Sequence, residues 1–79
     1  IELDLRGFRF DDAMGEAERF LNAAYQARYP MVTIITGHGT GALKKGLKDL
    51  LKQLKFVADT KSHRETDDGA TTILLDLST

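Results

Sequence analysis

The sequence contains no cysteine and no tryptophan, and its single proline is Pro30. Without cysteine the chain has no disulfide framework and no thiolate metal site, which fits an intracellular protein. No apolar run approaches the ~18 residues of a membrane span, and no signal peptide is visible. These absences argue against a disulfide-stapled secreted domain, and they lead us to expect a cytoplasmic protein with no membrane partner.

What the chain does contain is ordinary for a globular domain, with 42% hydrophobic and 29% charged residues among 79. A chain of this length buries about 60% of its unfolded surface, which is enough for one modest core. We therefore expect residues 1–79 to form a single domain. Because the sequence starts at Ile1 rather than Met, we also expect it to be a piece excised from a longer protein.

Charge is unevenly spread along the chain, although the net charge is only −1. Residues 1–30 carry four basic and six acidic side chains, residues 31–64 carry seven and two, and residues 65–79 carry none and four. A basic middle between acidic ends favours a localised anionic partner over general adhesion to polyanions. The alternative is a surface charged for solubility alone.

Hydrophobic periodicity predicts the element order β-α-β-α-β-β. The expected strands cover residues 1–6, 31–36, 56–58 and 70–77, and the expected helices run from Asp11 or Asp12 to before Pro30 and from Ala42 to Leu54. In the first strand, Ile1, Leu3 and Leu5 should face the core. Residues 59–69 are polar and predict a mobile loop. This alternation predicts a two-layer α/β sandwich with a mixed four-stranded sheet, a right-handed parallel first crossover and a final hairpin. With two helices, one face of the sheet could stay partly open.

The strongest local signal is the Gly-His-Gly-Thr-Gly turn at residues 37–41, between the strand at 31–36 and the helix at 42–54. Glycine lets the backbone approach a ligand closely and adopt positive φ. The helix then offers the positive end of its dipole, and Lys44 and Lys45 follow in its first turns. The pattern predicts a phosphate-binding turn, unless the glycines serve a tight connection alone.

The turn matches neither of the two common nucleotide motifs. G-x-x-x-x-G-K-[ST] is absent, and the glycine spacing is one residue short of G-x-G-x-x-G. His38, inside the turn, is a candidate general acid or base, phosphate donor or metal ligand, because its pKa lies near neutrality. A lone loop histidine is otherwise simply exposed or structural.

A second constellation lies on one face of the first strand, where Glu2, Asp4 and Arg6 alternate with apolar residues. Two carboxylates could hold a divalent cation such as Mg²⁺ or Mn²⁺, and arginine could hold a phosphate. The alternative is the polar face of an ordinary strand. If the first two strands are parallel neighbours, their carboxyl ends coincide, and Arg6 should then lie near His38.

A basic ridge follows the second helix opposite its leucine stripe, formed by Lys44, Lys48, Lys52 and Lys55. Such a ridge is the electrostatic footprint of a nucleic-acid binder. It is also what a solvated helix surface shows. Inside this helix, Gly46 should cost about 1 kcal/mol relative to alanine, and close packing would explain its presence.

Three motifs together resemble Smr (small MutS-related) domains across nearly the whole chain. Leu3-Asp4-Leu5-Arg6-Gly7 resembles the L-D-L-H-G signature, residues 38–41 match H-G-x-G, and Gly69-x-Thr71-x-Ile73-x-Leu75 resembles the closing G-x-T-x-V-x-L strand. Arginine at position 6 is similar to the form at the C-terminus of a recombination-suppressing bacterial MutS paralogue. Arginine cannot act as a base at neutral pH, so any mechanism that uses histidine there fails.

The resemblance implies a fold similar to the C-terminal domain of bacterial initiation factor three, together with metal-assisted endonuclease activity on nucleic acid. It implies roles in recombination and DNA repair, and a homodimeric parent that binds ATP on another domain, while the excised domain is monomeric. We hypothesise a nuclease that nicks branched DNA. One alternative is a non-catalytic module that docks a MutS-type ATPase on DNA or on ribosomal RNA of the ribosome, and another is a small-molecule phosphate binder.

Each candidate site residue has a predicted role. The catalytic candidates are Asp4, Arg6 and His38, and the metal ligands would be Glu2 and Asp4. The predicted nucleic-acid contacts are Arg6, Arg9, Gly37, His38, Gly39, Thr40, Gly41, Lys44, Lys45 and Lys48.

Overall fold

The computed structural model describes residues 1–37, 41–63 and 67–78. Its elements follow the order β1 (Glu2–Asp4), α1 (Phe10–Gln26), β2 (Met31–Ile35), α2 (Ala42–Gln53), β3 (Val57–His63) and β4 (Asp67–Leu75). The sheet order is β1-β2-β4-β3, with β1 parallel to β2 and β4 antiparallel to both of its neighbours. The predicted α/β class, the mixed sheet and the final hairpin are therefore confirmed. No helix of the described residues is long and apolar enough to cross a membrane.

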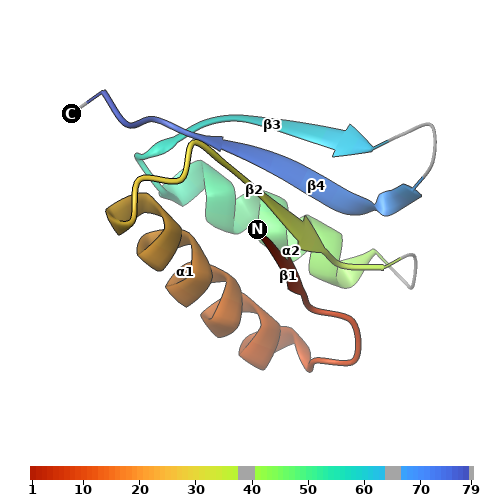
Figure 1. Ribbon diagram of the computed structural model, residues 1–79. Helices are drawn as coiled ribbons and strands as arrows, with labels where there is room; N and C mark the ends of the chain where they lie inside the picture. The colour runs from red at the N-terminus through yellow and green to blue at the C-terminus, as the bar shows by residue number, and fades with distance from the viewer. Residues whose placement is uncertain (38–40, 64–66, 79) are drawn as a thin grey trace.

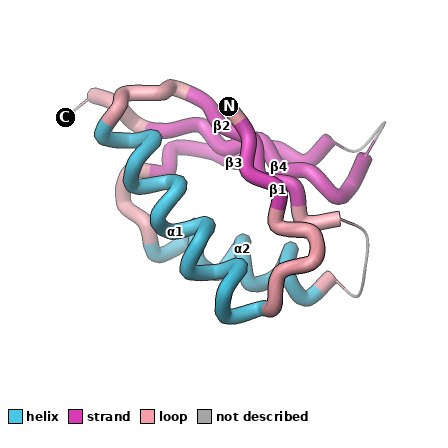
Figure 2. Tube along the Cα trace, turned by 60° about the horizontal axis from the view of Figure 1, so that its bottom comes forward, coloured by secondary structure: helices cyan, strands magenta, loops and turns pink. Residues whose placement is uncertain are grey.

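Both helices cover the same face of the sheet, and the other face carries no layer (Figure 1; Figure 2). Cross-strand partners point to the same side, so the register Leu3↔Ile34 and Val32↔Ile73 assigns these side chains to the helix-covered face. The fully buried side chains with the largest volumes are Leu5, Leu21, Ile34, Leu47, Ile73 and Val32. On the open face, Met31 remains 53% exposed. The structure is thus a two-layer sandwich with a single core.

The core is closed at one end by an aromatic stack. Tyr25, in the last turn of α1, stacks on Phe56 with ring centroids 4.5 Å apart. The backbone N–H of Asp76 donates to the Phe56 carbonyl at 2.7 Å, which joins the end of β4 to the segment after α2. These contacts connect the C-terminal ends of α1 and α2 to the end of β4.

The predicted polar loop at residues 59–69 is wrong for most of its length. β3 continues to His63 and β4 starts at Asp67, with register shifts between Val57 and Asp59 and between Ser62 and His63. β3 is an edge strand paired on one side alone, so solvent reaches polar residues on it and the usual apolar alternation is lost. Its pairing with β4, rather than its own pattern, makes it a strand.

Two smaller predictions at the N-terminal end are also wrong. Arg9, not an aspartate, occupies the N-cap of α1, while Asp11 and Asp12 lie in its first turn, where they still favour the positive helix end. Ile1 is 58% exposed, because it precedes a short edge strand, whereas Leu5 is fully buried.

Gly46 lets α1 and α2 pack closely. A Cβ at this position would lie 2.5 Å from Phe10 Cε2 and 3.0 Å from Met14 Sδ, both on α1. Hydrogen is therefore the largest substituent that fits without moving these two side chains, and close packing accounts for a glycine inside the helix.

We predict that the effect of Gly46→Ala on stability depends on Phe10. In the wild-type background the new methyl displaces the ring, and overpacking of this kind costs ~1–3 kcal/mol, which exceeds the ~1 kcal/mol gained in helix propensity. In a Phe10→Ala background the ring is gone, and the same substitution should become stabilising. Urea unfolding of the four proteins of this cycle measures the difference; an equal effect of Gly46→Ala in both backgrounds would contradict it.

Candidate phosphate-binding site

The carboxyl ends of β1, β2 and β3 lie at one end of the sheet. β1 is parallel to β2, and β3 has the same direction as β2 because both are antiparallel to β4. α1 and α2 run back along the sheet, so each helix also begins at this end (Figure 1). Three strand exits and two helix N-termini therefore share one rim, the usual place for a ligand in an open α/β sheet.

Gly37 begins the turn that leaves β2, and its position is held by β4. The backbone N–H groups of Thr36 and Gly37 donate to the Gly69 carbonyl at 2.6 and 3.1 Å, and the buried Thr36 hydroxyl donates to it at 3.2 Å. Gly37 has φ +79°, in the left-handed region that glycine adopts without strain. The start of the glycine-rich turn is thus anchored to the sheet.

Arg6 and Asp4 form a bidentate ion pair where β1 ends. Arg6 Nη2 and Nε donate to Asp4 Oδ2 and Oδ1 at 2.7 and 3.0 Å, and the Arg6 backbone N–H donates to Oδ1 at 2.9 Å. The side-chain hydrogen bonds from Arg6, followed by the one from its backbone N–H, lower the pKa of Asp4 from 3.8 to about 2. Both side chains remain solvent-accessible, so the pair presents an oriented guanidinium at the rim.

The arginine side chain also lies against the glycine turn. A Cβ on Gly37 would lie 3.1 Å from Arg6 Cγ and 3.4 Å from Cδ, so the aliphatic stem of Arg6 passes directly over Gly37. The predicted meeting of the first strand exit with the glycine turn is confirmed at this residue. His38, the predicted neighbour of Arg6, lies outside the described residues, as do Gly39 and Thr40.

The N-cap residue of α2 offers no capping side chain. Its N-cap is Gly41, at φ +84°, and no acidic residue lies in its first turn. The positive end of the helix dipole is therefore not neutralised by a carboxylate of its own first turn, and Lys44 and Lys45 add positive charge beside it. An oxyanion is the ligand that suits such a helix end.

The remaining predicted contacts lie at different distances along the helices. Arg9 is exposed and immediately precedes α1 at the rim end. Lys48 is exposed on α2, one turn beyond Lys44 and so about 6 Å farther from the rim. The structure thus places Arg6 and Gly37 in contact, and Lys48 outside that contact.

The predicted metal ligands do not fit a ready cation site. Glu2 and Asp4 lie on the same face of β1, but both oxygens of Asp4 accept hydrogen bonds from Arg6. In the part of the chain that the structure describes, no group of three histidine, cysteine, aspartate or glutamate side chains comes together. A divalent ion at Asp4 would have to share the carboxylate with Arg6 or displace it.

Sequence reasoning missed the role of Gly69, whose carbonyl receives three hydrogen bonds from the segment after β2. Its place in the closing-strand motif was the available signal. The sequence also led us to predict that Asp4 binds a metal cation, whereas in the structure it pairs with Arg6. Opposite charges two residues apart on one strand face were the signal for that ion pair.

Fold and rim together define a class: a small α/β domain that gathers an oriented arginine, a glycine turn and a helix N-terminus at the carboxyl edge of its sheet, as anion-binding domains do. The chain belongs to the Smr domain family, whose model matches residues 3–76. The Smr assignment suggested by the three sequence motifs is therefore confirmed.

Similar proteins include bacterial nucleases of much greater length. The chain is 42% identical to the putative endonuclease MutS2 of Bacillus subtilis over 77 residues, which cover 98% of this chain and 10% of that protein. It is 57% identical to the endonuclease MutS2 of Levilactobacillus brevis over 51 residues, covering 65% of this chain and 6% of that protein. The chain thus spans about a tenth or less of these relatives.

Two solved structures share the fold. The Smr domain of Thermus thermophilus MutS2 superposes with a TM-score of 0.88 at 28% identity, covering 94% of this chain and 95% of that one. YdaL, a stand-alone small MutS-related protein of Escherichia coli, has a TM-score of 0.87 at 17% identity, covering 94% and 63%. The second likeness concerns the fold alone.

We predict that the low pKa of Asp4 depends on Arg6. In Arg6→Gln the backbone hydrogen bond stays but the guanidinium is lost, so the pKa should rise from about 2 toward 3.8. Since pairing lowers the folded-state pKa, its stabilisation is present above the unfolded value and disappears as the pH falls toward 2. Carboxyl NMR titration measures the shift.

Asp76 is an internal control for this titration. Hydrogen bonds from Ser78 lower its pKa, so Arg6→Gln should leave it unchanged. Arg9→Gln removes another exposed positive charge, at the N-cap of α1, and should leave the pKa of Asp4 unchanged as well. An identical Asp4 titration in Arg6→Gln and wild type would disprove the assignment.

We further predict that Gly37→Ala and Gly41→Ala differ in their effect on Arg6. Both residues have positive φ, +79° and +84°, so each alanine should destabilise the fold by roughly 1–2 kcal/mol. Apart from its chain neighbours, nothing lies within 4 Å of a Cβ at Gly41, whereas a Cβ at Gly37 meets Arg6. Gly37→Ala alone should therefore raise the Asp4 pKa; the same pKa in both variants would refute a contact between Arg6 and Gly37.

Proposed function

We propose that this chain is a nucleic-acid-binding, nuclease-type domain that nicks DNA, with a preference for branched or recombination-intermediate structures. The observation that carries the proposal is Arg6, oriented by Asp4 and packed on Gly37, at the end of the sheet where α2 begins. Membership of the Smr family and the endonuclease names of its relatives support it. The basic row on α2 suits a phosphate backbone.

In this proposal the backbone phosphate binds between Arg6 and the start of α2. A guanidinium carries five donors, so it can hold a carboxylate and a phosphate together, and Asp4 keeps it oriented before the DNA arrives. The helix dipole and Lys44 stabilise negative charge on the phosphate as it is attacked. His38 would protonate the leaving oxygen or orient the phosphate, and Arg9, Lys45 and the rest of the glycine turn would contact the strand.

A role for Mg²⁺ or Mn²⁺ on Glu2 and Asp4 remains a prediction. The ion pair between Asp4 and Arg6 opposes it, because Arg6 already donates to both oxygens of the carboxylate. No step of the phosphate-binding scheme requires the metal.

The same ion pair favours a second candidate function. If Asp4 serves only to orient Arg6, the domain binds phosphate without chemistry of its own. It would then dock a larger MutS-type ATPase on branched DNA or on ribosomal RNA. The longer protein would be a cytoplasmic homodimer with ATP on another domain, and the domain by itself a monomer.

We predict that the chain nicks supercoiled plasmid and that His38→Ala lowers the rate by about 100-fold or more, the usual contribution of a general acid. Asp4→Ala and Arg6→Ala should also slow nicking, and Arg6→Ala should weaken binding to DNA. Conversion of supercoiled to open-circular plasmid measures the rate, with EDTA, Mg²⁺ and Mn²⁺ in separate reactions.

Arg19→Ala is the matched control, because Arg19 pairs with Glu16 in the middle of α1 and should leave nicking unchanged. Undiminished nicking by both Asp4→Ala and His38→Ala would remove the catalytic assignment. If the wild type binds DNA but does not nick it with any of these metals, the docking module is favoured. If it does not bind DNA even at low salt, both proposed functions are refuted.

A further inference from the structure

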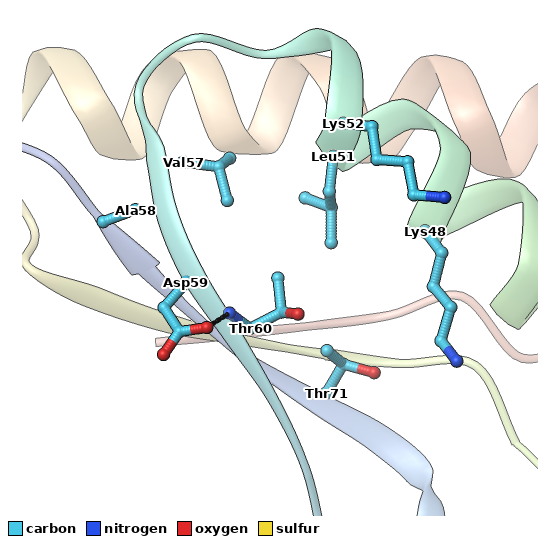
Figure 3. Close-up of a pocket in the computed structure, with 8 residues that line it drawn as sticks. All are labelled: Lys48, Leu51, Lys52, Val57, Ala58, Asp59, Thr60 and Thr71. Atoms are coloured by element: carbon cyan, nitrogen blue, oxygen red, sulfur yellow. Dashed lines mark hydrogen bonds between the residues drawn. The ribbon is translucent and has the colours of Figure 1, made fainter.

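A separate hollow of about 300 Å³ opens between α2 and the edge strand β3 (Figure 3). It is lined by Lys48, Leu51, Lys52, Val57, Ala58, Asp59, Thr60 and Thr71. These residues come from the middle and end of α2, the first half of β3 and the neighbouring strand β4, whereas the rim site uses β1, β2 and the start of α2. The hollow is therefore a second feature, which the phosphate site does not explain.

The lining combines apolar surface with hydroxyl groups. Leu51 from the helix faces Val57, Thr60 and Thr71 from the strands, and the space lies between them (Figure 3). Leu51 and Thr71 are each 5% exposed, so they form a buried floor, while Thr60 is exposed at the mouth. The Asp59 carboxylate accepts a hydrogen bond from the Thr60 backbone N–H at 2.8 Å, which fixes the strand beside the opening.

Two ammonium groups stand at the mouth on the helix side. Lys48 and Lys52 lie four residues apart, about 6 Å along one face of α2, and both are exposed. Neither has a carboxylate partner among the residues that the structure describes. They continue the row that starts with Lys44 at the phosphate site, so one track of positive charge joins the rim to the hollow.

We infer that this hollow binds an unpaired nucleotide of a nucleic-acid strand, with its base against Leu51, Val57 and Thr71 and its phosphates on Lys48 and Lys52. A base offers flat apolar faces and hydrogen-bonding edges, which match a floor of aliphatic and hydroxyl groups, and the hollow is at the small end of the roughly 300–1,000 Å³ seen for ligand sites. The inference rests on the proposed function and deepens it, since it names the feature of the DNA that is recognised.

A paired base cannot enter such a hollow while it is stacked in the duplex. An unpaired or mismatched base costs least to turn out of the stack, so the hollow selects DNA with a bulge, gap or branch over a continuous duplex. From Lys44 to Lys52 is about 12 Å along the helix axis. One strand can thus reach both sites, with a phosphate at the rim and an unpaired base nearby.

The test compares the affinity of the protein for a short blunt duplex with its affinity for the same duplex carrying one unpaired nucleotide, by fluorescence anisotropy. We expect the wild type to bind the bulged DNA about tenfold more tightly, the range seen for one bound base. Thr60→Tyr, which fills the mouth with a residue that strands favour, should abolish this preference and leave duplex affinity within about twofold.

Thr60→Val is the matched control, because it keeps the side-chain volume, and it should retain most of the preference. An unchanged duplex affinity in Thr60→Tyr shows that this variant is folded. Equal binding of the two DNAs by the wild type, or a preference that survives Thr60→Tyr, would overturn the base-binding hollow while leaving the proposed nicking of DNA at the rim intact. Absence of binding to either DNA at low salt would refute both.

Amide NMR titrations distinguish the two sources of a nucleotide. Shifts at Thr60 and Thr71 with deoxyadenosine monophosphate would show that a free nucleotide suffices. Shifts at these residues with the bulged duplex alone would show that the strand is needed to bring the base in. In either case the hollow is the site, and shifts confined to the rim around Arg6 and Gly37 would exclude it.

Discussion

The parallel pairing of β1 with β2 is the constraint on which the rest of this structure depends. The Leu5 N–H donates to the Ile35 carbonyl at 2.7 Å, and the Thr33 N–H donates to the Ile1 carbonyl at 3.0 Å. β1 has just three residues, so these bonds alone would hold it weakly. The fully buried Leu5 and the crossover through α1 add the burial that keeps it in place. Because of this pairing, the chain leaving β1 lies beside the chain leaving β2.

The ion pair between Asp4 and Arg6 then decides what the rim can do. While Asp4 holds Arg6, the guanidinium has a fixed orientation at the rim, and both oxygens of the carboxylate already accept hydrogen bonds from it. In the proposed function, Asp4 therefore serves to orient Arg6 rather than to hold a metal. The pKa of about 2 means that the carboxylate stays ionised throughout the physiological range, so the ion pair is not lost by protonation there.

Much of the fold could be predicted from local patterns, because α1, α2, β1 and β2 each present one apolar face at the helix or strand period. For β3 the pattern predicted just the first residues, since the rest of this edge strand is polar and depends on β4 for its hydrogen bonds. The exposed Ile1 shows the same limit at the other edge of the sheet. The hydrophobic pattern indicates which faces of an element are buried, and an edge strand buries little of its surface.

At the site, the local sequence was enough to identify Asp4, Arg6 and the glycine turn as candidates. Glycines and charged residues that lie within a few positions of one another indicate an anion-binding turn without any knowledge of the fold. The contact of Arg6 with Gly37, the anchoring of Gly37 by Gly69 and the hollow over Thr71 join residues far apart in the chain. Such contacts follow from strand order and register, which depend on how all the elements pack at once. Tertiary structure alone therefore settled them.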